Sequence, residues 1–142
     1  MNEKTKPFRD QHEKLVGIIV EISGFLDDID MIKENSNKIS RLISELKRSL
    51  KVHLALEDNS LYPVLLIAED ETVKNKAVEF KEEMGSIDNT FQEYISRWSS
   101  GFRIQENPSD FVNESKILFD SLGKRIEKEN NNLYVIIDEM FR

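Results

Sequence analysis

Residues 50 to 63 read Leu-Lys-Val-His-Leu-Ala-Leu-Glu-Asp-Asn-Ser-Leu-Tyr-Pro, and this stretch decides the fold. In and around it, apolar residues return every three or four positions, which is the spacing of one face of an α-helix. Two polar residues, His53 and Glu57, stand on that face where hydrophobic residues are expected. Residues four apart on a helix have Cβ atoms about 5–6 Å apart, so an imidazole and a carboxylate can reach one metal ion. The rest of the chain must supply partners for both groups, because burying an unpaired polar group costs about 2–7 kcal/mol.

The composition is that of an acidic, helical protein. The 142 residues are 33% charged and 39% hydrophobic, with 5 glycines and 3 prolines, and we expect one domain over residues 1–142. The net charge of −7 argues against a nucleic-acid-binding surface, which needs clustered Lys and Arg. The chain has no cysteine, and no apolar run has the length that a membrane span needs. We therefore expect a cytoplasmic protein that binds neither nucleic acid nor membrane.

Four segments show the apolar periodicity of amphipathic helices. We predict helices at about 7–27, 36–67, 72–99 and 109–141, with short polar connections between them. Pro7 suits the first turn of the first helix, and Pro63 is expected to kink or end the second helix near its last turn. Four such helices with short connections predict an all-α fold, an up-down-up-down antiparallel four-helix bundle.

Three of the predicted helices carry polar residues on their apolar faces. These residues are His12 in the first helix, His53 and Glu57 in the second, and Arg125 and Glu129 in the fourth. A single histidine on an apolar face is usually a hydrogen-bonded core residue. Here both of the chain's 2 histidines lie on such faces, at levels of the bundle that can meet. Two imidazoles and two carboxylates are ligands for a first-row transition metal, and bundle cores often hold such sites.

A metal-free interpretation of the same residues is also open. Arg125 and Glu129 are four residues apart and can form an internal salt bridge. With one divalent metal, the charges of Arg125, Glu57 and Glu129 leave the cluster at +1; without metal they leave it at −1, which one protonated histidine would neutralise. Two divalent metals would leave +3, which is hard to hold in a low-dielectric core. The charges therefore disfavour a two-metal site.

Several segments resemble the hemerythrin family, in its bacterial HHE cation-binding branch, and the resemblance covers nearly the whole chain. They are Arg-Asp-Gln-His-Glu-Lys-Leu around His12, His53-x-x-x-Glu57-Asp58-x-x-Leu61-Tyr62-Pro63, Glu83-Met84-x-x-Ile87, and Arg125-Ile-Glu-Lys-Glu129-Asn130-x-x-Leu133-Tyr134. The second is close to the family pattern H-x-x-x-E-E-x-x-L-[FY]-P. Members with the full set of ligands hold two irons, bridged by two carboxylates and an oxo or hydroxo group. They are associated with reversible O2 binding, oxygen or redox sensing, and iron handling.

The chain departs from the family pattern at two replaced ligand positions. Met84 and Arg125 stand where the resemblance leads us to expect histidines that hold one of the two irons. The set that the family uses at the other iron is complete, and it consists of His12, His53, Glu57 and Glu129. We therefore expect one iron per chain, although zinc or manganese would accept the same ligands. We also expect the Arg125 guanidinium to replace the second metal and to pair with both carboxylates.

Three functions follow from these observations. The first is a hemerythrin-like protein that holds one metal, with O2 as a candidate ligand, and serves oxygen or redox sensing or iron handling. The second is a metal-free four-helix interaction or structural module with a buried salt-bridge cluster at the former metal site. The third, an enzyme that activates O2 at a single iron, is the least expected, because the sequence indicates no substrate. It also indicates no particular protein partner.

Overall fold

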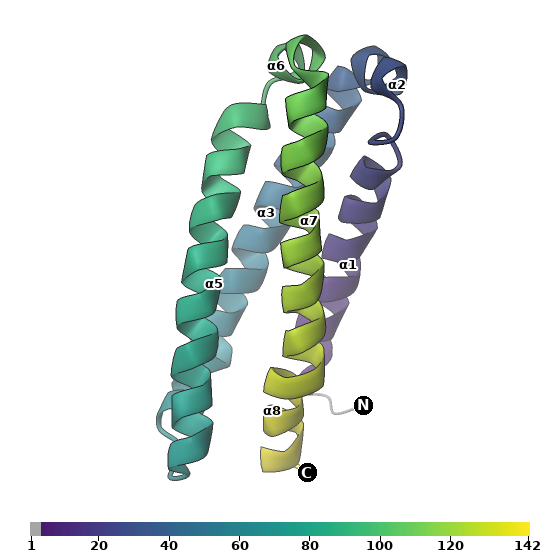
Figure 1. Ribbon diagram of the computed structural model, residues 1–142. Helices are drawn as coiled ribbons and strands as arrows, with labels where there is room; N and C mark the ends of the chain where they lie inside the picture. Colours follow the sequence, from purple (N-terminus) through teal and green to yellow (C-terminus); the bar gives the residue numbers. More distant parts are fainter. Residues whose placement is uncertain (1–3) are drawn as a thin grey trace.

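The chain folds into an elongated bundle of antiparallel helices (Figure 1). The computed structural model describes residues 4–142, and this part of the chain contains no β-strand. The long helices are α1 (Lys6–Ser23), α3 (Ser36–Ser60), α5 (Glu71–Trp98) and α7 (Pro108–Lys128). The short ones are α2 (Ile29–Glu34), α4 (Tyr62–Leu66), α6 (Gly101–Glu106) and α8 (Tyr134–Met140). The long helices alternate in direction, which confirms the predicted all-α up-down-up-down bundle.

The helix boundaries follow local sequence signals. The Asp28 and Asp70 carboxylates accept backbone N–H bonds at the starts of α2 and α5, at 2.9 and 2.8 Å. The first helix ends at Ser23, before the predicted boundary at 27, and the turn that follows leads into α2. The second predicted helix divides at Leu61, because α3 ends at Ser60 and Pro63 lies in the first turn of α4. This break agrees with the effect expected of Pro63.

A π-helical turn, η1 (Glu129–Leu133), interrupts the last long helix. The sequence predicted a continuous helix over 109–141, in which the apolar face keeps a constant period from Glu129 onward. The structure instead buries Tyr134 and Ile137, whereas the Met140 side chain, eleven residues after Glu129, is 43% exposed. A π turn contains more residues than an α turn, so it rotates the face that follows it. This correction places Tyr134 in the core.

Two clusters of buried hydrophobic side chains form the core. The larger cluster begins at Leu15, Leu50 and Leu122 and extends toward α2 and α6. The smaller one lies nearer the chain termini and includes Phe8, Leu61 and Leu133. Between the two clusters lie the buried polar residues His12 of α1, His53 and Glu57 of α3, Arg125 of α7, and Glu129. Every helix within residues 4–142 is too short or too polar to span a lipid bilayer.

Candidate metal centre

Four buried side chains from three parts of the chain meet between the two hydrophobic clusters. They are His12 of α1, His53 and Glu57 of α3, and Glu129 at the start of η1. Each is at most 2% exposed, and one nitrogen or oxygen atom from each lies within 4.8 Å of the other three. The structure thus brings together all four residues that the sequence singled out. Their role as metal ligands stays a prediction.

Both histidines direct Nε2 toward the centre of this cluster. The Nδ1 atom of His12 lies 2.8 Å from Asn130 Oδ1, and the Nδ1 atom of His53 lies 2.8 Å from Gln11 Oε1. Amide oxygens only accept hydrogen bonds, so each Nδ1 atom carries a proton and donates. Such an outer hydrogen bond fixes the tautomer and leaves Nε2 to bind a metal. The two Nε2 atoms are 3.0 Å apart, so a proton or a metal ion must separate their lone pairs.

The carboxylates complete a set of donors spaced for one ion. Glu129 Oε1 lies 2.8 Å from His12 Nε2 and 3.4 Å from His53 Nε2. Glu57 Oε2 lies 3.3 Å from His53 Nε2. Donors around a four-coordinate ion, with bonds of about 2.0–2.2 Å, lie about 3.3–3.6 Å apart. These three separations are within about 0.5 Å of that spacing. The four donors as a set lie within 4.8 Å of one another, so they would move closer together to hold one metal ion.

Glu57 has an oxygen atom that the protein leaves without a partner. Its Oε2 atom accepts a hydrogen bond from the Tyr134 hydroxyl at 2.8 Å. Its Oε1 atom is buried and has no hydrogen-bond partner. Within residues 4–142, every other buried side-chain nitrogen or oxygen has a partner. A buried oxygen in this condition costs about 1–3 kcal/mol, and more when it is charged. A metal ion bound to Glu57 would remove that cost.

The Tyr134 hydroxyl contacts all four clustered side chains. It lies 3.0 Å from Glu129 Oε1, 3.1 Å from His12 Nε2 and 3.3 Å from His53 Nε2. Burial raises the pKa of this phenol, and the charges of Glu129 and Glu57 raise it further. The sequence did not predict this contact, because its apolar pattern indicated a continuous last helix. The run of three asparagines at 130–132, which has weak helix propensity, was the signal for an interruption.

Arg125 lies beside the four residues and forms an ion pair with Glu129. Its Nε atom donates to Glu129 Oε2 at 2.6 Å, and both side chains are buried. A terminal nitrogen donates to the Tyr62 hydroxyl at 3.2 Å. The expected ion pair with Glu57 is not formed, so that part of the prediction is wrong. The charge of Arg125 therefore acts on the Glu129 side of the cluster.

The second replaced position, Met84, also borders the cluster. Its side chain is 7% exposed and lines a cavity of about 20 Å³ together with His12, His53 and Glu129. The other walls of this cavity are mainly apolar side chains of α1, α3 and α7. A cavity of this size holds about one water-sized molecule. Met84 thus forms the α5 wall of the cavity, and it offers the site no nitrogen or oxygen donor.

Burial and hydrogen bonds shift the pKa values of three clustered side chains in opposite directions. Burial lowers the pKa of His53, but hydrogen bonds to Glu129 and Glu57 outweigh it and raise the pKa to about 9. Burial raises the pKa of Glu57. Burial also acts to raise that of Glu129, but hydrogen bonds with His12 and His53 and the charge of Arg125 hold the Glu129 pKa well below its usual value. A protonated His53 and the Arg125 guanidinium would both offset the negative charge of Glu129.

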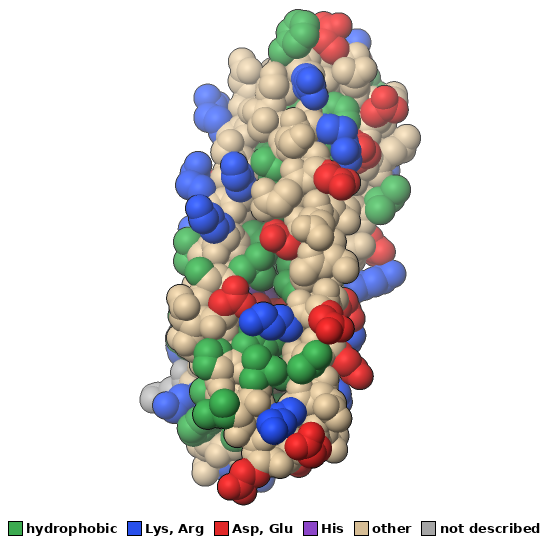
Figure 2. All heavy atoms as spheres, turned by 90° about the vertical axis from the view of Figure 1, so that its left-hand side faces the viewer, with side chains coloured by type: hydrophobic (Ala, Val, Ile, Leu, Met, Phe, Trp, Pro, Cys, Tyr) green, Lys and Arg blue, Asp and Glu red, His purple; other side chains and the backbone are tan. Residues whose placement is uncertain are grey.

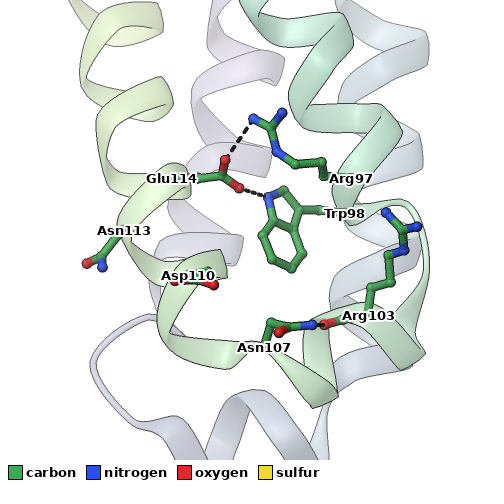
Figure 3. A pocket seen from close by; sticks show the side chains of 7 residues that line it. All are labelled: Arg97, Trp98, Arg103, Asn107, Asp110, Asn113 and Glu114. Atoms are coloured by element: carbon green, nitrogen blue, oxygen red, sulfur yellow. Dashed lines mark hydrogen bonds and ion pairs between the residues drawn. The ribbon is translucent and has the colours of Figure 1, made fainter.

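A larger pocket lies near α6, away from the candidate ligands (Figure 3). Its volume is about 370 Å³, and its walls come from α5, α6 and α7. The Glu114 carboxylate there accepts a hydrogen bond from the Trp98 indole and pairs with Arg97 at 2.7 Å. These contacts join α7 to α5. We therefore attribute Glu114 to packing at this end of the bundle.

Comparison with known proteins identifies the family. A family model described as the hemerythrin HHE cation binding domain matches residues 4–137, which include all four clustered side chains. Searches of curated proteins and of solved structures found no match. The match spans nearly the whole chain and implies cation binding. The chain belongs to the hemerythrin HHE cation-binding domain family.

Proposed function

We propose that this protein binds one iron ion through His12, His53, Glu57 and Glu129. The observation that carries the proposal is the convergence of two Nε2 atoms and two carboxylates within 4.8 Å, in a site that is closed to solvent. The outer hydrogen bonds from Nδ1 orient both imidazoles for metal binding. Nitrogen and oxygen donors suit iron, zinc and manganese, and iron is the metal of the family that the sequence resembles.

The limit of one ion rests on the two replaced positions. The Arg125 guanidinium is fixed against Glu129 at 2.6 Å and supplies a positive charge beside the cluster. A second divalent ion there would meet this charge in a buried, low-dielectric environment. Met84 offers a thioether, which is a poor ligand for a site of nitrogen and oxygen donors. Both replacements thus disfavour a second metal.

We propose oxygen or redox sensing, or iron handling, as the role of this site in a cytoplasmic protein. A bound iron would supply a redox-active centre that can interact with O2. The adjoining cavity of about 20 Å³ has room for a molecule the size of water, but not for an organic substrate. Tyr134 would hold Glu57 in place, and its ring stacks against His12 with centroids 5.1 Å apart. These features favour binding over catalysis on an organic compound.

A metal-free module is the second candidate, and the ion pair and hydrogen bonds within the cluster support it. Hydrogen bonds to Glu129 and Glu57 raise the pKa of His53 to about 9, so a proton on His53 would offset carboxylate charge when no metal is bound. In that case the cluster would serve only to fix the packing of the helices. The unpartnered Oε1 atom of Glu57 favours the metal-binding proposal over this one.

Thermal unfolding with and without Fe(II), under anaerobic conditions, tests the choice between the two. Iron at 100 times its dissociation constant is expected to stabilise the wild-type protein by about 2.7 kcal/mol and to raise its melting temperature. The His53→Ala variant should show no iron-dependent shift, because it loses one of the four donors. Glu83→Gln, which alters a carboxylate outside the cluster, is the matched control and should keep the shift. A wild-type protein that does not respond to iron, zinc or manganese would support the metal-free module.

A further inference from the structure

A surface pocket between α3 and α5 extends inward to Glu57, one of the four clustered residues. The pocket has a volume of about 150 Å³, and Glu57 forms part of its wall. Leu54 and Asp58 of α3 and Met84 and Gly85 of α5 also line it. Figure 2 faces the α5 side of the bundle, where a strip of hydrophobic side chains in the lower half is bordered and crossed by charged ones. The pocket thus extends from the surface as far as a side chain that is itself 0% exposed.

The oxygen atoms of Glu57 have different surroundings. Oε2 is held by the Tyr134 hydroxyl at 2.8 Å and lies 3.3 Å from His53 Nε2. Oε1 has no hydrogen-bond partner among residues 4–142, although it is buried. A carboxylate oxygen without a donor, on a residue that lines a surface pocket, is suited to receive a cation. Glu57 is therefore the first candidate ligand that an ion in this pocket would meet.

Met84 separates the surface pocket from the interior of the cluster. It lines both the pocket of about 150 Å³ and the inner cavity of about 20 Å³, which His12, His53 and Glu129 also line. The methionine side chain is unbranched and has three rotatable bonds, so it can change rotamer without moving the helix. A movement of this single side chain would join the two spaces.

The outer part of the pocket carries charge and has open space. Asp58 and Asp88 are carboxylates on opposite walls, one on α3 and the other on α5. Lys81 is the basic residue there, and its Nζ atom lies 5.5 Å from the centre of the Tyr62 ring. A Cβ atom added at Gly85 would have no neighbour within 4 Å. A larger side chain at position 85 can therefore start from this wall of the pocket without a clash at its Cβ atom.

A pocket on the other side of α3 does not reach a candidate ligand. It lies between α1 and α3 and is lined by Gln11, whose Oε1 atom accepts the hydrogen bond from His53 Nδ1. Its walls include none of the four clustered residues. An ion there would face the outer side of His53, where Nδ1 is already engaged.

We propose that the pocket between α3 and α5 is the route by which a divalent cation reaches the buried site. Asp58 and Asp88 attract the hydrated ion, Glu57 Oε1 binds it first, and rotation of Met84 lets it pass to the histidines. This inference rests on the proposed metal-binding function. It concerns how fast the ion binds and not how tightly.

Stopped-flow binding of Co²⁺ to the metal-free protein tests the route, because coordinated Co²⁺ absorbs visible light. Gly85→Leu is expected to slow loading at least about tenfold, which corresponds to about 1.4 kcal/mol added to the barrier. The final amount of bound Co²⁺ should equal that of the wild type. The matched control is Gly123→Leu on α7, where an added Cβ also has no neighbour within 4 Å. Both variants gain the same helix propensity, so only a blocked pocket distinguishes them.

Two further variants test the charges at the mouth of the pocket. Asp58→Asn combined with Asp88→Asn should slow loading, with a larger effect at low salt than at high salt. Lys81→Met should speed it. Co²⁺ binding at the wild-type rate in Gly85→Leu would overturn the route and leave the proposed function intact. A wild-type protein that binds no Co²⁺ or Fe²⁺ would overturn the proposed function, and the route with it.

Discussion

Replacing Arg125 with methionine is expected to lower the free energy of unfolding of the metal-free protein by about 3–5 kcal/mol, because it leaves a buried carboxylate without its cation. Arg125 Nε lies 2.6 Å from Glu129 Oε2, and each side chain of the pair is 2% exposed. The guanidinium also donates to Tyr62 and lies over the Phe80 ring, 4.8 Å from its centroid. Methionine keeps much of the apolar contact and removes the charge. Urea unfolding at pH 7 measures the loss.

Lys128→Met is the matched control for this substitution. Lys128 pairs with Glu83 at 2.8 Å, but the two side chains are 45% and 43% exposed. Exposed pairs of this kind contribute about 0–1 kcal/mol, so the control should be close to wild type. Addition of Fe(II) should restore more stability to Arg125→Met than to Lys128→Met, since a bound ion would compensate Glu129. A loss below about 1 kcal/mol in Arg125→Met would show that the buried ion pair does not stabilise the fold.

Combining Met84→His with Arg125→His is expected to raise iron content from about one to about two per chain, if each histidine contributes a donor for a second ion. The substitutions replace a thioether and a fixed cation with imidazoles at two positions that line the same cavity beside the existing cluster. Met84 already lines the same cavity as His12, His53 and Glu129, so a histidine there would face the site. Glu57 Oε1 has no hydrogen-bond partner, and Glu129 Oε2 would lose its partner when Arg125 is replaced. Both carboxylates would then have an oxygen atom with which to bridge the two ions.

Each single substitution serves as a control for the pair. Met84→His alone retains the Arg125 charge, and Arg125→His alone retains the thioether, so both should keep about one iron, as one half-site would remain incomplete. Elemental analysis after anaerobic loading and desalting gives the number of ions. A double variant that still binds one iron would contradict the assignment of positions 84 and 125 to a lost second site.

The sequence predicted the parts of the site that interrupt a regular pattern. His12, His53, Glu57 and Glu129 stand on apolar helical faces, and the period of 3.6 residues was enough to place them inside the bundle. Pro63 likewise marked the division between α3 and α4.

The sequence did not predict the parts that depend on local geometry. The π-helical turn at Glu129–Leu133 shifts the phase of the last helix, so the burial of Tyr134 could not be read from a constant period. Gln11 and Asn130 are polar residues at helix positions where polar residues are normal, and nothing in their pattern indicated contacts with histidines. Arg125 pairs with Glu129 and not with Glu57 because of its side-chain rotamer, and helical periodicity does not determine rotamers.

One metal ion is expected to bind per chain, and counting the metal tests this most directly. The purified metal-free protein is loaded with Fe(II) under anaerobic conditions, desalted, and analysed for iron and protein. We expect about one iron per chain, because the four donors form one set and Arg125 supplies a positive charge beside it. A value near zero with iron, zinc and manganese would contradict metal binding. A value near two would show that Arg125 moves away and that the charge argument is wrong.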